Sequence, residues 1–138
     1  MPGRALGVDY GEKRIGVAVS DALGIAATPV EVVQQATPAA AADRIAEIAR
    51  DREVETLVFG LPVNMDGSDH PSAPRIEAFA ALCAQRTGLP VEYVDERLTT
   101  KQAERHLGRA KQTRKSKKAK VDKVAAALLL QNWLDSRR

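Results

Sequence analysis

Cysteine and histidine are scarce in this chain, and their scarcity argues against several kinds of site. Cys83 is the sole cysteine among 138 residues, so no internal disulfide can form, which suits the reducing conditions of the cytoplasm. Its helical, apolar surroundings predict a buried small side chain rather than a nucleophile. The two histidines, His70 and His106, have no partner at a metal-ligand spacing in the sequence. We therefore assign neither histidine a catalytic role.

Long apolar runs are absent as well. We therefore expect neither a signal peptide nor a membrane span. The length suits one domain over residues 1–138 with one core, and it is too short for two. Tryptophan occurs once, and Trp133 falls on the apolar side of a predicted helix. We expect it in the core rather than as a platform on which bases stack.

Hydrophobic periodicity predicts five strands. Residues 5–8 and 15–19 are apolar segments joined by a polar, glycine-containing turn, and a third strand covers residues 26–33. Two further strands, residues 55–60 and 89–94, each come after a predicted helix. Because strands that follow crossover helices lie parallel to the first strand, the later two should be parallel to it and buried on both faces.

The helical segments complete an α/β fold. Thr37 and Pro38 predict the cap and first position of a helix that ends near residue 52, and Gly88 predicts the end of a second helix. Thr99 can cap a third helix, and the last helix should span residues 119–135. The sequence therefore predicts a mixed five-stranded sheet, three antiparallel strands followed by two parallel ones, with helices on both faces.

Acidic residues stand where three of these elements begin or end. Asp9 follows the first strand, Asp95 and Glu96 follow the last strand, and Asp122 lies at the head of the apolar stripe of the last helix. Because adjacent side chains on a strand point to opposite faces, only one of Asp95 and Glu96 can share a face with Asp9. Two simpler interpretations remain open: in the first, Asp9 only shapes a hairpin turn with Gly11, and in the second, Asp122 only favours the start of its helix.

Carboxylates from two strand ends and one helix would form an oxygen-rich cluster without histidine or cysteine. Such a cluster suits Mg²⁺ or Mn²⁺ rather than zinc. Two such ions about 4 Å apart can activate water and stabilise the leaving oxygen of a phosphodiester. The acids therefore predict a metal-dependent nuclease.

Basic residues gather in one segment, although the whole chain has a formal charge of only +3. Such a run on a nearly balanced protein indicates a polyanion such as nucleic acid. The alternative is a solvent-exposed loop that only aids solubility. Lys13 and Arg14, at the first turn, could contact the nucleic-acid strand that is cut, or they could help to order the hairpin. The basic segment contains Arg105, Arg109, Lys111, Arg114, Lys115, Lys117, Lys118 and Lys120.

Five segments, taken in order, resemble the YqgF (RuvX) family over nearly the whole chain. They are VDYG at 8–11 with RIGVA at 14–18 and SD at 20–21, GLP at 60–62, NMDG at 64–67, DERLTT at 95–100 and DKVAA at 122–126. The resemblance implies an RNase H-like fold related to the RuvC resolvases. It implies the catalytic and metal-binding acids Asp9, Glu96 and Asp122, and so chooses Glu96 over Asp95. Members of the family are described as Holliday junction resolvases and as nucleases that mature the precursor of small-subunit (16S) rRNA.

Other functions fit the sequence less well. A sugar-kinase or actin-like ATPase needs two such domains and a second phosphate hairpin, which this chain lacks. A non-catalytic nucleic-acid-binding module would gain nothing from carboxylates beside its phosphate surface. Between pre-rRNA and branched DNA as the substrate, Ala125 and Ala126 stand where the RuvC pattern has a second helical acid, which favours RNA. Symmetric cutting of a junction would favour a two-fold homodimer.

Overall fold

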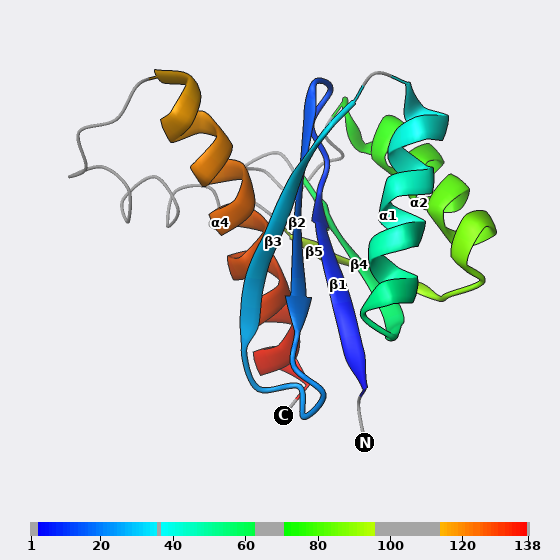
Figure 1. Ribbon diagram of the computed structural model, residues 1–138, viewed down its shortest axis with the longest axis vertical. Helices are drawn as coiled ribbons and strands as arrows, with labels where there is room; N and C mark the ends of the chain where they lie inside the picture. The colour runs from blue at the N-terminus through cyan, green and yellow to red at the C-terminus, as the bar shows by residue number, and fades with distance from the viewer. Residues whose placement is uncertain (1–2, 36, 63–70, 96–113, 138) are drawn as a thin grey trace.

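The computed structural model describes residues 3–35, 37–62, 71–95 and 114–137, and over residues 114–123 it describes the backbone only. Figure 1 shows the described elements in chain order. They are β1 (Arg4–Asp9), β2 (Arg14–Ser20), β3 (Ala27–Gln34), α1 (Pro38–Asp51), β4 (Val54–Leu61), α2 (Ala73–Thr87), β5 (Val91–Asp95) and α4 (Arg114–Ser136).

The five strands form one sheet in the order β3-β2-β1-β4-β5. β1 pairs antiparallel with β2, and β2 pairs antiparallel with β3. β4 lies parallel to β1 on its other side, and β5 lies parallel to β4. The predicted mixed sheet, with three antiparallel strands followed by two parallel ones, is confirmed.

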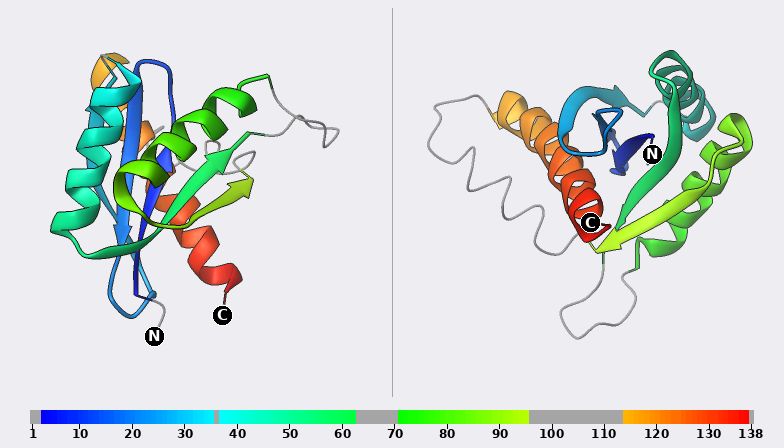
Figure 2. Two further views of the ribbon diagram at one scale, coloured as in Figure 1. Left: turned by 90° about the vertical axis from the view of Figure 1, so that its right-hand side faces the viewer. Right: turned by 90° about the horizontal axis from the view of Figure 1, so that it is seen from below.

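The helices cover both faces of the sheet, as predicted. α4 lies against one face, whereas α1 and α2 lie side by side on the other (Figures 1 and 2). α4 contacts β1, β2 and β3 most extensively. In Figure 1, α4 descends as β1 ascends, so the N-terminal half of α4 lies at the same end of the sheet as the end of β1.

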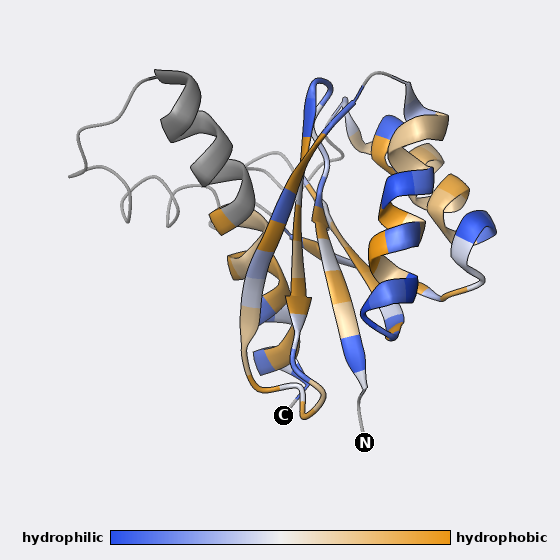
Figure 3. Ribbon diagram, viewed as in Figure 1, coloured by the Kyte–Doolittle hydropathy of each residue, from blue (hydrophilic) through white to orange (hydrophobic). Residues whose placement is uncertain are grey.

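Two hydrophobic clusters occupy the spaces on either side of the sheet, where Figure 3 shows apolar colour along the strands. On the α1/α2 side, Leu6, Val8 and Phe59 of the strands pack with inward-facing residues of both helices. On the α4 side, Ala5, Ala18 and Val58 pack against α4 residues that include the predicted stripe of Ala126, Leu129 and Trp133. The burial of Trp133, which is 7% exposed, confirms its assignment to the core.

Local signals set the ends of α1 and α2. The Thr37 side chain accepts a hydrogen bond from the Ala40 N–H, and Pro38 occupies the first turn of α1, both as predicted. Gly88 ends α2 in the left-handed conformation, with φ of 72°. Glycine adopts this conformation without the steric cost that a side chain would add, which explains its position there.

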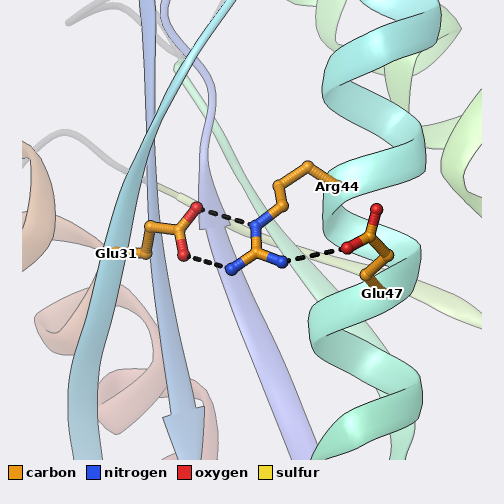
Figure 4. A network of polar contacts seen from close by, with 3 residues as sticks. All are labelled: Glu31, Arg44 and Glu47. Atoms are coloured by element: carbon orange, nitrogen blue, oxygen red, sulfur yellow. Dashed lines mark hydrogen bonds and ion pairs between the residues drawn. The ribbon is translucent and has the colours of Figure 1, made fainter.

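An ion-pair network attaches the edge strand β3 to α1 (Figure 4). The Arg44 guanidinium donates to both carboxylate oxygens of Glu31, at 2.9 and 2.6 Å, and to Glu47 at 3.1 Å. The hydrogen bond and charge of Glu31 raise the pKa of Arg44. The two-pronged geometry fixes the angle between strand and helix more than a single contact would.

The last helix begins earlier than predicted. α4 starts at Arg114 rather than near residue 119, so the C-terminal part of the basic segment is helical. Among the described residues, none of the helices is long and apolar enough to cross a membrane. The predicted helix after Thr99 lies outside the described residues.

Candidate functional site

Asp9 lies at the end of the central strand β1 and on the face that α4 covers. Leu6 and Val8 belong to the α1/α2 cluster, whereas Ala5 belongs to the α4 cluster. Since side chains alternate along a strand, Gly7 and Asp9 share the face of Ala5. The Asp9 side chain is half-buried at this end of the sheet.

Gly7 allows α4 to approach β1 closely, just before Asp9. A Cβ at position 7 would lie 2.8 Å from Leu130 Cβ and 3.0 Å from the Ala126 carbonyl oxygen. Any larger residue would therefore push the helix away from the strand. Since β1 and α4 run in opposite directions, residue 122, one helical turn before Ala126, is displaced from Gly7 toward the same end as Asp9.

Asp95 lies on the opposite face of the sheet from Asp9. On β5, Glu92 accepts a hydrogen bond from Trp133 Nε1 of α4 at 3.1 Å, whereas the Tyr93 ring contacts Phe59 in the α1/α2 cluster. Alternation then assigns Asp95 to the face of Tyr93. Of the two acids that the sequence left open, Asp95 is therefore the one that cannot share a face with Asp9.

The β1–β2 turn (residues 10–13) lies directly beside Asp9 and is held from two sides. The Gln35 side chain, just after β3, donates to the carbonyl oxygens of Gly11 and Glu12. From α2, Arg75 forms an ion pair with Glu12, and the Phe79 ring contacts the Tyr10 ring at 5.1 Å between centroids. The sequence did not reveal Gln35 or Arg75, because neither forms a motif with its chain neighbours.

The basic residues are described only in part. Lys13 is exposed in the β1–β2 turn, and Arg14 begins β2 half-buried. Arg114, Lys115, Lys117 and Lys118 belong to the first turns of α4, whose backbone alone is described. Arg109, Lys111 and the acid Glu96 lie outside the described residues, and so does the side chain of Asp122.

Two observations limit the chemistry of the described part. Among residues whose side chains are described, no three His, Cys, Asp or Glu residues are grouped so as to hold a metal ion. Cys83 is fully buried in α2, and burial raises the pKa of its thiol to about 12. The prediction that Cys83 is a buried small side chain is confirmed, and its burial disfavours the thiolate form that a nucleophile needs.

Comparisons with known proteins agree on fold and family. A structure of RuvC from Thermus thermophilus in complex with a Holliday junction substrate matches with a TM-score of 0.60 over 98% of this chain and 95% of that one, at 17% identity. The family model described as "RuvX: Holliday junction resolvase" matches residues 3–136. A Picosynechococcus protein is 45% identical over 137 residues, which cover 99% of this chain and 95% of the relative. A protein of Ligilactobacillus salivarius is 44% identical over 138 residues, covering 98% and 94%.

The strand order and the helices on both faces define an RNase H-like α/β fold, which the chain shares with RuvC. The chain belongs to the RuvX family. Both relatives carry the name "Putative pre-16S rRNA nuclease".

Proposed function

We propose that the protein is a metal-dependent nuclease that hydrolyses phosphodiester bonds in the precursor of 16S rRNA. Membership of the RuvX family and the names of the relatives support a phosphodiester-cleaving hydrolase acting on nucleic acid. The observation that carries the proposal is the approach of β1 and α4 at Gly7. β1 and α4 pack closely at Gly7 and run in opposite directions. The end of β1, with Asp9, therefore lies at the end of the sheet at which α4 begins.

Three carboxylates would form the active site: Asp9, Glu96 and Asp122. Asp9 is half-buried on the face that α4 covers, and Asp122 belongs to the turn of α4 before the close contact. Glu96 follows Asp95, which faces away from Asp9. The next position in an alternating strand is the one that would return to the face of Asp9.

The donor set fits Mg²⁺ or Mn²⁺, because it consists of carboxylate oxygens, which these hard cations prefer. Asp9, Glu96 and Asp122 would hold one or two ions. When bound, such ions lower the pKa of water and offset negative charge on the reacting phosphate. Asp9, at the end of the central strand β1, would present its carboxylate from a rigid position. The packing of α4 against Gly7 would limit the access of water from that side.

Basic residues would bind the substrate backbone. Lys13 is exposed beside Asp9, and the N-terminal part of α4, which carries Arg114, Lys115, Lys117 and Lys118, lies toward the same end of the molecule as the end of β1. Arg14, Arg109 and Lys111 complete the set proposed from the sequence. Ammonium and guanidinium groups would neutralise phosphates on both sides of the scissile bond.

The observation that favours RNA over a junction is the burial of two small residues on α4. Ala125 and Ala126 are 2% and 0% exposed, and they occupy the turn after Asp122 where the RuvC pattern has a second acid. Resolution of a Holliday junction is the second candidate function, because the family model carries that description. A resolvase would act as a two-fold homodimer.

The test is a cleavage assay with Mg²⁺ or Mn²⁺ that offers a pre-16S rRNA fragment and a four-way DNA junction in parallel. Wild type should cut the RNA, and Asp9→Asn should abolish cutting. The melting temperature of the variant should equal or exceed that of wild type, because loss of a carboxylate relieves repulsion among the acids.

Asp51→Asn is the matched control, since Asp51 is an exposed aspartate at the end of α1. It should cut RNA at the wild-type rate. Cutting of the junction alone would replace the RNA proposal with the resolvase. Binding of nucleic acid without cutting of either substrate would contradict a nuclease and indicate a non-catalytic binding module.

A further inference from the structure

Gln35 makes several polar contacts with the β1–β2 turn. Its side-chain Nε2 donates to the Gly11 carbonyl oxygen at 2.7 Å and to the Glu12 carbonyl oxygen at 3.0 Å. Its backbone N–H donates to the Lys13 carbonyl oxygen at 2.9 Å. One residue after β3 therefore binds three consecutive carbonyl groups of the turn.

The amide group is well suited to this task. A side-chain NH₂ has two donor hydrogens, and here each of them has a carbonyl acceptor in the turn. The remaining Oε1 lies 3.4 Å from the Tyr10 hydroxyl, a long contact that adds little. Gln35 is half-buried, so water competes with these bonds less than it would on an open surface.

The turn itself is tight, and it joins two groups of the proposed site. A Cβ at Gly11 would collide with the Arg14 carbonyl oxygen, so the main chain folds back on itself with no room to spare. Asp9 precedes the turn by one residue, and Lys13 is its last residue. A shift of the main chain at residues 10–13 would therefore move the Asp9 carboxylate relative to the Lys13 ammonium group.

We propose that Gln35 is a positioning residue of the active site. By holding the carbonyl groups of Gly11, Glu12 and Lys13, it fixes the turn so that Asp9 can bind metal while Lys13 contacts the substrate backbone. This inference rests on the proposed nuclease function. The contacts of Gln35 are with main-chain carbonyl groups of the turn, so it would act on Asp9 through the main chain.

The experiment replaces Gln35 in two ways. Gln35→Met keeps the length of the side chain and removes both donors without adding charge. Gln35→Glu keeps the shape and places a carboxylate opposite two carbonyl groups. Gln131 provides the matched control: its side chain accepts from the Ala27 N–H and donates to the Ile25 carbonyl, which holds the β2–β3 connection at the other end of the sheet.

Hydrogen exchange, Mn²⁺ affinity, steady-state kinetics and melting temperature are measured for Gln35→Met, Gln35→Glu and the same two substitutions at Gln131. Hydrogen exchange of the amides of residues 10–13 should be faster in both Gln35 variants and unchanged in both Gln131 variants. Mn²⁺ affinity and kcat on the pre-rRNA fragment should each fall about tenfold or more in the Gln35 variants only, with KM changing less than kcat. Melting temperatures should fall in both pairs, which separates positioning from a general loss of stability.

The outcomes separate this inference from the nuclease proposal. If wild type cuts nothing, the nuclease proposal fails, and weaker Mn²⁺ binding by the Gln35 variants still supports positioning. If Gln35 and Gln131 variants bind Mn²⁺ equally, Gln35 holds the fold and not the site. A defect in Gln35→Glu without one in Gln35→Met would assign the effect to the added charge and overturn the proposal.

Discussion

Gly7 is the residue at which the absence of a side chain matters most for the proposed site. The Ala126 carbonyl and Leu130 Cβ of α4 occupy the space that a side chain at position 7 would need. The first atom of any side chain would separate α4 from β1. The same separation would move Asp122 relative to Asp9, so the packing and the site depend on one contact.

Gly7→Ala should therefore reduce both stability and cleavage. Overpacking of this kind costs roughly 1–3 kcal/mol in the free energy of unfolding, which urea denaturation measures. Cleavage of the pre-rRNA fragment should also slow, because the displaced helix would move Asp122 relative to Asp9.

Gly88→Ala is the control for the Gly7 substitution. A Cβ there meets no atom within 4 Å, but φ of 72° disfavours alanine by about 1 kcal/mol. It should lower stability and leave the cleavage rate unchanged. Equal urea midpoints for Gly7→Ala and wild type would show that the contact with α4 can relax.

At the scale of elements, the carboxylate of Asp21 stabilises the connection between β2 and β3, together with the Gln131 side chain. Asp21 Oδ1 accepts from the Ile25 N–H at 2.9 Å, and Oδ2 accepts from the Ala26 N–H at 3.2 Å. These bonds to the charged form, led by that of Ile25, lower the pKa of Asp21 from its ordinary value of 3.8. The ionised form of Asp21 is therefore the form that contributes to the stability of this connection.

The direction of the pH effect follows from the lowered pKa. The unfolded chain binds a proton at Asp21 more readily than the folded one, so this contribution to stability is complete above pH 3.8. It is lost as the pH falls through the lower pKa of the folded state. Asp21→Ala should lower the urea midpoint relative to wild type at pH 7, and this difference between the two proteins should shrink as the pH falls below 3.8. A difference that stays constant with pH would contradict the role of the charge.

The sequence predicted the elements whose ends carry a steric or hydrogen-bonding signal. The start of α1 is indicated by Thr37 and Pro38, and the end of α2 by the left-handed Gly88. Each signal lies within a few residues of the helix end that it predicts. The alternation of Ile15, Val17 and their small neighbours predicted β2 for the same reason. Such signals depend only on residues that are close together along the chain, so they can be read directly from the sequence.

The predicted start of α4, near residue 119, was wrong because it was inferred from apolar spacing alone. Residues 114–118 contain no apolar stripe, yet lysine and arginine are good helix formers and need no packing to extend a helix that has already begun. The contacts of Gln35 were missed because they join the end of β3 to a turn about twenty residues earlier. Within the candidate site, alternation limited the choice to Asp95 or Glu96, and only the packing of Tyr93 against Phe59 showed which face Asp95 takes.

At the scale of the whole molecule, charge is unevenly distributed along the chain. The formal charge is +3, but basic residues gather in residues 105–120, part of which forms the first turns of α4. If these side chains bind phosphates, association with nucleic acid must release counterions.

Neutralising Lys115, Lys117 and Lys118 together should flatten the salt dependence of binding. Loss of three phosphate contacts should reduce the slope of log K against log salt by about 2–3. Fluorescence anisotropy with a labelled pre-rRNA fragment and Asp9→Asn protein measures the slope without cleavage. Replacing Arg50, Arg52 and Arg86, which lie at the C-terminal ends of α1 and α2, should leave the slope unchanged. Equal slopes for both triple variants would remove the basic segment from the binding surface.

The position of α4 has a consequence for how the protein is made. One apolar face of the sheet, which includes Ala5, Ala18 and Val58, is covered by a helix that the ribosome synthesises after every strand. The bond between Ala27 and Gln131 joins residues 104 positions apart, so that face remains bare through most of synthesis. The same helix carries Asp122. The fold and the proposed site would thus be completed in one late step, and a nascent chain would have no capacity to cut RNA until that step.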